Sequence, residues 1–193
     1  MRKLIVSMNL TLDGFIAGPD CELDWHFDYW NNEMLMSISD QLSHADTILL
    51  GRVTYRAMAK YWQYKANDLC QSREDIAFTD MMNSYNKIVF SKTLSAPEWN
   101  NSSLIKQSAD KVIYQLKREA GRDMIIYGSG HLVSSLMKTN LIDEYVLWIH
   151  PVVLGRGIAF FNKLRHKRNL KLVKTKIFDC GVVILNYEVG SFR

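Results

Sequence analysis

Short apolar runs that end in glycine or serine and continue as helices constrain this chain more than any other feature. The clearest run covers residues 124–127 (MIIY), breaks at residues 128–130 (GSG), and gives way to apolar residues at helical spacing over residues 132–137. Similar apolar runs end at Gly51 and at Ser91. Repeated strand, turn and helix predict an α/β fold with a mainly parallel sheet.

The remaining periodicity extends this α/β pattern to both ends of the chain. It predicts strands at residues 3–12 and 142–150 and helices at residues 31–43, 53–60, 72–83 and 109–119. Residues 61–72 and 100–103 are predicted to be irregular. Residues 170–178 and 182–189 flank a turn and predict an antiparallel hairpin at the sheet edge. We therefore expect a three-layer α/β sandwich in which residues 1–193 form one domain.

The junctions after these strands also predict a binding site. Glycines let a backbone approach a ligand closely, and the first turn of a helix leaves N–H groups free for an anion. A lone G-x-G is equally compatible with an ordinary β–α turn. However, ligands of open α/β sheets lie at the carboxyl ends of the strands. Three such ends on one sheet predict a groove that suits a dinucleotide.

Composition limits the class of protein. The chain has 193 residues, of which 48% are hydrophobic and 23% charged, as is typical of a globular protein. Cys21, Cys70 and Cys180 are far apart and form no C-x-x-C pair, which argues against a zinc site or a disulfide framework and favours a reducing cytoplasm. The N-terminal run lacks the apolar core of a signal peptide, and no run approaches membrane-spanning length.

A basic block contributes to the net charge of +4. Its members are Lys163, Arg165, Lys167, Arg168, Lys171, Lys174 and Lys176. Nucleic-acid binding is one interpretation, but no interleaved aromatic residues or known motif accompany the block. We prefer a solvated surface, with long-range attraction of a phosphorylated cofactor as a further option.

An aromatic and acidic segment, residues 22–30 (ELDWHFDYW), has two interpretations. It either lines a pocket for a flat ring or covers the core. The histidines do not offer a rival function, because no H-E-x-x-H is present and no metal site is expected. A hydrolase is equally disfavoured, since the chain has no G-x-S-x-G.

Several stretches stand in a characteristic order along the chain. They are MNLTLDGFIAG (residues 8–18), LDW (23–25), LLGRVTY (49–55), IVFSKT (88–93), IIYGSGHL (125–132) and DEYVLWIHPVVLGRG (143–157). In this order and spacing the chain resembles the dihydrofolate reductase fold. It resembles more closely the reductase domain of the riboflavin pathway and its small stand-alone bacterial relatives. The resemblance covers nearly the whole chain and implies a dihydrofolate reductase-like sandwich.

The resemblance also implies NADPH as the cofactor, bound across the carboxyl edge of the sheet. The matching positions are Gly51, Arg52, Val53 and Thr54 for the phosphates, Phe90, Ser91 and Lys92 for the adenosine end, Gly128, Ser129, Gly130, His131 and Leu132 for the pyrophosphate, and Asn9, Ile16 and Ala17 for the nicotinamide. Arg52 is the candidate for the 2′-phosphate, because a guanidinium makes paired hydrogen bonds to its oxygens. The alternative is an ordinary surface arginine. The chain departs from the family in Ser129, which replaces a glycine, and in His131, which replaces an arginine.

The proton donor is less well defined by the resemblance. Dihydrofolate reductase uses a carboxylate on its first helix, and no residue here matches it cleanly. Glu33 on the predicted first helix and Asp24 or Asp28 in the aromatic segment are candidates. Asp13 lies in a turn, where it either takes part in catalysis or caps the following backbone.

Three functions follow from the resemblance. The first is an NADPH-dependent reductase that transfers a hydride to a small heterocyclic or C=N-bearing substrate, pterin- or pyrimidine-like. The second is the 5-amino-6-ribosylamino-pyrimidine reductase of riboflavin synthesis, which would need a separate deaminase because the chain lacks the H-x-E and P-C-x-x-C signature. The third is a non-catalytic nucleotide-binding protein. Besides a small-molecule substrate, a homodimer is expected, and neither nucleic acid nor a membrane is expected as a partner.

Overall fold

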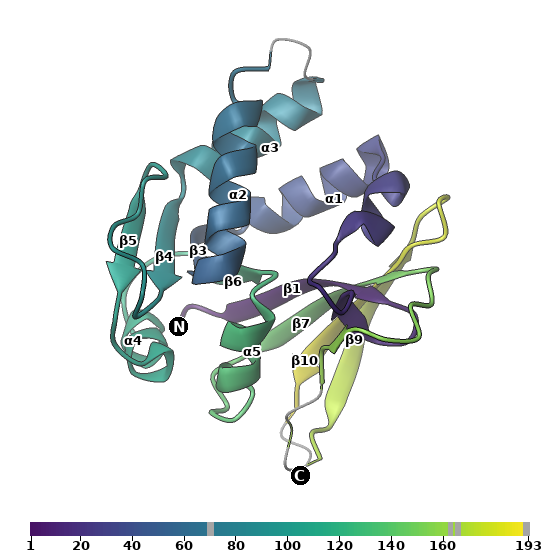
Figure 1. Ribbon diagram of the computed structural model, residues 1–193. Coiled ribbons are helices and arrows are strands. Elements are labelled where there is room, and N and C mark those ends of the chain that lie inside the picture. Colours follow the sequence, from purple (N-terminus) through teal and green to yellow (C-terminus); the bar gives the residue numbers. More distant parts are fainter. Residues whose placement is uncertain (69–71, 162–163, 165–166, 191–193) are drawn as a thin grey trace.

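The computed structural model describes residues 1–68, 72–161, 164 and 167–190, so the predictions for Cys70, Lys163 and Arg165 fall outside the described residues. Within these residues, eight strands form one sheet in the order β5-β4-β3-β6-β1-β7-β10-β9 (Figure 1). Their bounds are β1 Leu4–Thr11, β3 Ala45–Gly51, β4 Asn86–Phe90, β5 Ser102–Ile105, β6 Asp123–Tyr127, β7 Glu144–His150, β9 Leu170–Ile177 and β10 Val183–Val189. A small second sheet pairs β2 (Phe15–Ala17) with β8 (Ile158–Ala159).

The direction of the strands confirms the predicted topology. The neighbours from β5 through β7 run parallel to one another, whereas β10 is antiparallel to both β7 and β9. The antiparallel part is therefore the C-terminal hairpin, with β9 at the sheet edge.

Helices cover both faces of the large sheet (Figure 1). On one face lie α1 (Asn32–Ser43), α2 (Arg52–Lys65) and α3 (Arg73–Ser84), and on the other lie α4 (Ala109–Leu116) and α5 (Gly130–Leu136). Strand β1 has apolar side chains on both of its faces, so each face has to be covered by helices. Leu4, Val6 and Met8 belong to the core beneath α4 and α5, and the alternate residue Ile5 belongs to the core beneath α1–α3. The structure thus confirms a three-layer sandwich.

Polar caps fix where two of the helices begin. The side chain of Asn31 accepts a hydrogen bond from the backbone N–H of Met34 at 2.9 Å, and Ser72 accepts one from Asp75 at 3.1 Å. Each cap satisfies an N–H group that the first turn of a helix leaves without a partner.

Two segments differ from the prediction. Residues 100–103 were expected to be irregular, but β5 begins at Ser102 because it pairs with β4, a long-range contact that local composition does not reveal. Residues 61–72 were also expected to be irregular, but α2 continues to Lys65. The ring of Trp62 packs on Phe78 of α3 with centroids 5.2 Å apart, and this tertiary contact stabilises the extra turn.

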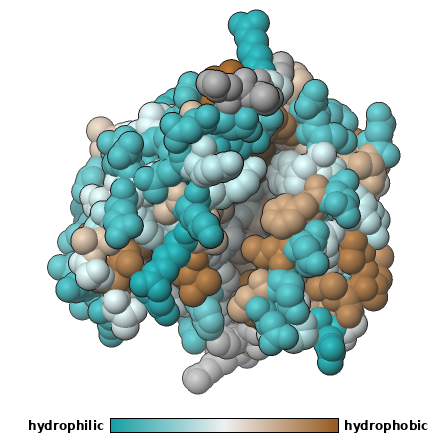
Figure 2. Space-filling view, turned by 45° about the horizontal axis from the view of Figure 1, so that its top comes forward, coloured by the Kyte–Doolittle hydropathy of each residue, from teal (hydrophilic) through white to brown (hydrophobic). Residues whose placement is uncertain are grey.

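The surface is mixed in character. Figure 2 shows hydrophobic residues gathered on the right of one face. On β9 the apolar side chains of Leu172, Val173 and Ile177 are exposed. Among the described residues, no helix has both the length and the hydropathy needed to cross a membrane.

Candidate functional site

The predicted strand ends at Gly51, Ser91 and Gly128 meet at one edge of the sheet. Strands β4, β3 and β6 are neighbours and parallel, so their carboxyl ends lie side by side. Gly51, the last residue of β3, stands opposite Phe90, the last residue of β4. The structure therefore brings Arg52, Ser91 and Ser129 to the same edge.

Ser129 connects two of these junctions directly. Its Oγ accepts a hydrogen bond from the backbone N–H of Gly51 at 2.9 Å, and its own N–H donates to Oγ1 of Thr54 at 3.0 Å. The backbone of Ser129 is left-handed, with φ 56° and ψ 50°, and its side chain is buried. A residue other than glycine rarely takes this conformation. The two hydrogen bonds stabilise it and hold the end of β3 against the turn after β6.

The glycines on either side of Ser129 are closely packed by the side chains of Thr54 and Ile16. Gly128 has φ +60°, and a Cβ there would lie 3.1 Å from Cγ2 of Thr54. A Cβ on Gly130 would overlap the Cδ1 atom of Ile16. The turn after β6 is therefore packed on one side by α2 and on the other by β2, which brings the residues predicted for the pyrophosphate next to one predicted for the nicotinamide.

Arg52 begins α2, and its side chain makes no hydrogen bond or ion pair among the described residues. Gly51, the residue at the N-cap, has no side chain to cap the helix, so the first N–H groups of α2 lack a side-chain acceptor. The start of a helix attracts negative charge, and Arg52 adds a full positive charge beside it. The adjacent Val53 is exposed. This end of α2 can therefore accept a phosphate group.

The adenosine-end candidates lie in the turn after β4. Oγ of Ser91 accepts hydrogen bonds from the backbone N–H groups of Thr93 at 3.2 Å and Leu94 at 3.0 Å, which shapes the turn. Lys92 is exposed on this turn. Of the two remaining pyrophosphate candidates, His131 is exposed at the start of α5, and Leu132 points into the core beneath α4 and α5.

The nicotinamide candidates lie at the end of β1 and on β2. Ala17 pairs with Ile158 of β8, which holds β2 in place. Oδ1 of Asn9 lies 3.3 Å from Nε2 of His150, at the end of the neighbouring strand β7. The candidate site therefore extends along the same edge of the sheet, from β6 across β1 to β7.

The acidic candidates occupy three separate elements. The carboxylate of Asp13 accepts hydrogen bonds from Oγ1 of Thr11 at 2.6 Å and from the N–H of Gly155 at 2.7 Å, which lower its pKa and tie two turns together. Glu33 on α1 forms an ion pair with Lys176 of β9 at 3.1 Å. Asp24 is exposed at the start of the 3-10 helix η1 (Asp24–Tyr29). A catalytic role for any of the three stays a prediction.

The aromatic segment packs over the end of β7. Segment η1 places its rings around His150, with the centroid of Trp25 5.3 Å and that of Tyr29 5.6 Å away. Trp30, directly after η1, packs against the core beneath α1–α3. Burial, assisted by the nearby His26, lowers the pKa of His150 to about 4. The segment therefore both covers the core and surrounds a neutral imidazole.

Sequence reasoning missed His150 as a site residue because it looked for the spacing of metal ligands among histidines. Its position in the sequence was the available signal. His150 ends a predicted strand just before Pro151, and other candidate site residues also stand at the ends of predicted strands.

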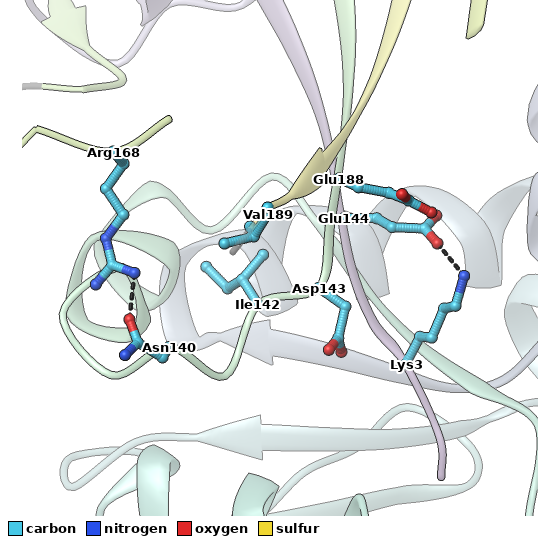
Figure 3. A pocket seen from close by; sticks show the side chains of 9 residues that line it. Lys3, Asn140, Ile142, Asp143, Glu144, Arg168, Glu188 and Val189 are labelled. Carbon is cyan, nitrogen blue, oxygen red and sulfur yellow. Dashed lines mark hydrogen bonds and ion pairs between the residues drawn. The ribbon is translucent and has the colours of Figure 1, made fainter. Parts of the chain in front are cut away.

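A cavity of about 510 Å³ lies at the opposite, amino end of β1 and β7 (Figure 3). Among the described residues, both of the cations that line it have partners: Lys3 pairs with Glu144, and Arg168 donates to the side chain of Asn140. It contains none of the candidate site residues. Since its cations already have partners, this cavity is not part of the candidate site.

Known proteins are similar to this chain over nearly its whole length. The model of the RibD C-terminal domain matches residues 2–184. The uncharacterized proteins YyaP and YwjB of Bacillus subtilis strain 168 are 34% and 31% identical, over 97% and 94% of this chain and 95% of each relative.

Solved structures share the fold. A putative riboflavin biosynthesis protein from Shewanella sp. PV-4 superposes with a TM-score of 0.76 at 22% identity, covering 96% of this chain and 98% of that one. The Thermotoga maritima diaminohydroxyphosphoribosylaminopyrimidine deaminase/5-amino-6-(5-phosphoribosylamino)uracil reductase superposes with a TM-score of 0.68 at 15% identity, covering 98% of this chain and 57% of that one. The predicted dihydrofolate reductase-like fold is thereby confirmed, and the chain belongs to the RibD C-terminal domain family.

Proposed function

We propose that this protein is an NADPH-dependent reductase that transfers a hydride to a small heterocyclic or C=N-bearing substrate. The observation that carries the proposal is the hydrogen bond from Gly51 to Ser129, which joins two glycine junctions at the carboxyl edge of the sheet. With Arg52 beside it, this joined edge offers backbone N–H groups and a cation to a nucleotide that bears several phosphates.

The residues present fit such a cofactor. Gly51 leaves room, because a Cβ there would meet nothing closer than Oγ of Ser129 at 3.7 Å. Thr54 accepts a hydrogen bond from Ser129, so its own hydroxyl proton remains for a phosphate oxygen. Arg52 would take the 2′-phosphate, and the N–H groups of Gly130 and His131 the pyrophosphate.

Bound along this edge, NADPH would supply the hydride near Asn9, Ile16 and Ala17. The protein's part is to orient the nicotinamide and to exclude water. Ile16 packs against the turn at Gly130, and β8 holds Ala17, so this wall is fixed by the fold. The substrate ring would then lie on the far side of β1, towards β7.

Membership of the RibD C-terminal domain family favours one more specific candidate: reduction of the ribosylamino-pyrimidine of riboflavin synthesis. The Thermotoga relative named for that reductase activity is also a deaminase, and this chain spans 57% of its length. Complementation of a riboflavin auxotroph lacking only the reductase tests this candidate. Growth supports it, and failure to grow despite NADPH turnover by the purified protein leaves the broader reductase proposal in place.

The broader proposal is tested by following the loss of NADPH absorbance with a panel of pterins, pyrimidines and quinones. We expect turnover with at least one ring compound, and an increase in KM for NADPH in Arg52→Ala that the matched surface variant Arg56→Ala does not show. Binding without turnover on the whole panel would support a non-catalytic nucleotide-binding protein instead. A folded protein that binds neither NADPH nor NADP⁺ would refute both.

We also propose that the protein acts in the cytoplasm as a homodimer. The exposed apolar residues Leu172, Val173 and Ile177 on the edge strand β9 support a second copy as the partner, because an edge strand with apolar side chains favours association. Sedimentation that gives a monomer at high protein concentration would refute the dimer.

A further inference from the structure

His150 has an unusual setting for a histidine. It ends β7, and its side chain is fully buried. Trp148, two residues earlier, belongs to the core beneath α1–α3, so His150 points to the same face of the sheet. Its Nε2 atom lies 3.3 Å from Oδ1 of Asn9, and the rings of Trp25 and Tyr29 stand edge-on to it.

Two polar atoms in this cluster have no partner. Nδ1 of His150 and Nε1 of Trp25 are both buried, and neither makes a hydrogen bond within the described residues. Other ring nitrogens nearby are satisfied: the Trp30 indole donates to Nδ1 of His26 at 3.2 Å, and the Trp148 indole donates to a serine hydroxyl at 3.1 Å. A buried polar atom without a hydrogen-bond partner lowers the stability of the fold. A bound ligand that supplies partners to both nitrogens would remove this cost.

The two atoms have complementary chemistry. The pKa of His150 is lowered to about 4 by burial, so its ring is neutral near pH 7 and has one donor and one acceptor nitrogen. Because Oδ1 of Asn9 can only accept, the proton of His150 is on Nε2 and Nδ1 is the acceptor. The indole nitrogen of Trp25 can only donate. Together they offer one acceptor and one donor.

We propose that His150 and Trp25 form a recognition pair for a planar heterocycle that carries an N–H group next to a carbonyl. The N–H of the ring donates to Nδ1 of His150, and its carbonyl oxygen accepts from Nε1 of Trp25. The inference rests on the proposed function for its position: Asn9, next to His150, is assigned to the nicotinamide, so the pair lies on the substrate side of the cofactor.

Segment η1 has to shift for a ring to reach the pair, since both atoms are shielded from solvent. The start of η1 has no side-chain cap, and its contacts with β7 are ring packing around His150. Such a segment moves more easily than a capped helix. Binding of a ring then places Trp25 in a new environment.

The experiment is calorimetric titration of lumazine, and of its fully N-methylated analogue, into protein saturated with NADP⁺. Lumazine carries the N–H and carbonyl edge, and the methylated ring keeps the shape without the donor. The variants are His150→Phe and Trp25→Phe, which keep an aromatic ring without the polar atom. His150→Asn keeps an acceptor near the position of Nδ1. Tyr29→Phe is the control, because it also packs on His150 and loses only a hydroxyl outside the pair.

We expect each Phe variant of the pair to bind lumazine about tenfold more weakly than the wild type, the loss that follows from one unmade buried hydrogen bond. His150→Asn should recover part of the affinity, and Tyr29→Phe should match the wild type. The methylated ring should bind weakly to every variant. NADP⁺ affinity, measured in the same way, should be equal in the wild type, Trp25→Phe and Tyr29→Phe, none of which alters a residue in contact with Asn9.

Equal binding of lumazine by the wild type and His150→Phe would overturn the inference, as would equal binding of both rings or no binding of lumazine by the wild type. If NADP⁺ still binds in those cases, only the recognition pair fails. Loss of NADP⁺ binding by the wild type would instead refute the proposed function. Melting curves of each variant identify any that fails to fold, and Trp25→Phe and His150→Asn keep the test decisive if His150→Phe is one of them.

Discussion

Gly51 and Ser129 are 78 positions apart in the sequence, yet the backbone N–H of Gly51 donates to Oγ of Ser129 at 2.9 Å. This hydrogen bond joins the end of β3 to the turn after β6. Thr54, in the first turn of α2, accepts from the N–H of Ser129 and closes the network. The proposed phosphate-binding groups lie on both junctions, so this network sets the spacing between them.

Substitutions of Ser129 test the network. Ser129→Ala removes the hydroxyl but keeps a Cβ in the left-handed conformation, so we expect a loss of about 1–2 kcal/mol in the free energy of unfolding. Ser129→Gly loses the same hydrogen bond but relieves about 1 kcal/mol of backbone strain. Urea denaturation should therefore rank Ser129→Gly above Ser129→Ala. The reverse order would contradict the left-handed backbone at this position, and the exposed Ser135→Ala serves as the control.

Substitutions of two glycines before β8 distinguish the energetic cost of backbone strain from that of a steric clash. A Cβ on Gly157 would overlap the carbonyl oxygen of Ala17, whereas a Cβ on Gly155, also at positive φ, would meet nothing within 4 Å. Gly155→Ala should cost about 1 kcal/mol from strain alone. We expect Gly157→Ala to cost at least about 2 kcal/mol more, because backbone atoms must shift. It should also weaken NADPH binding, since Ala17 is displaced. Similar melting temperatures for the two variants would show that β2 and β8 do not pack as described.

The buried His150 predicts a loss of stability in acid. The pKa of its ring is lowered from 6.5 to about 4 in the folded chain. As the pH falls, the unfolded chain therefore takes up a proton on this ring before the folded chain does. The contribution of this shifted pKa to the free energy of unfolding is fully present above pH 6.5. It is lost as the pH falls towards 4, and the loss amounts to about 3 kcal/mol at most. Chemical denaturation between these pH values should show a smaller decrease in His150→Phe than in the wild type. A His44→Ala control, which alters an exposed histidine, should follow the wild type, and identical pH dependence in His150→Phe would contradict a neutral His150.

Local periodicity was enough to predict much of the fold. The strands of the parallel part have apolar runs, and the polar residues Asn31 and Ser72 cap the starts of α1 and α3. Strand β5 was missed because Ser102 and Ser103 carry no apolar pattern, and it is β4 that makes this segment a strand. Helix α2 was predicted too short because its last turn depends on the contact between Trp62 and Phe78.

The candidate site was partly predictable for a similar reason. The glycine junctions at Gly51 and Gly128 are visible in the sequence, and parallel topology places them at one edge. The hydrogen bond between Gly51 and Ser129 depends on side-chain geometry across two strands and leaves no local signal. The contact of Trp25 with His150 is likewise long-range, and it turns an unremarkable strand end into a buried, neutral imidazole.

The central claim is that the carboxyl edge of the sheet binds NADPH, with Arg52 on the 2′-phosphate. Titration calorimetry of NADPH and NADH with the wild type, Arg52→Ala and Arg56→Ala tests it most directly. NADH lacks the 2′-phosphate, so it measures every other contact of the cofactor. We predict that the wild type and Arg56→Ala bind NADPH about ten- to a hundredfold more tightly than NADH, and that Arg52→Ala loses this preference but still binds NADH. Absence of saturable binding by the folded wild type, or an unchanged preference in Arg52→Ala, would contradict the account.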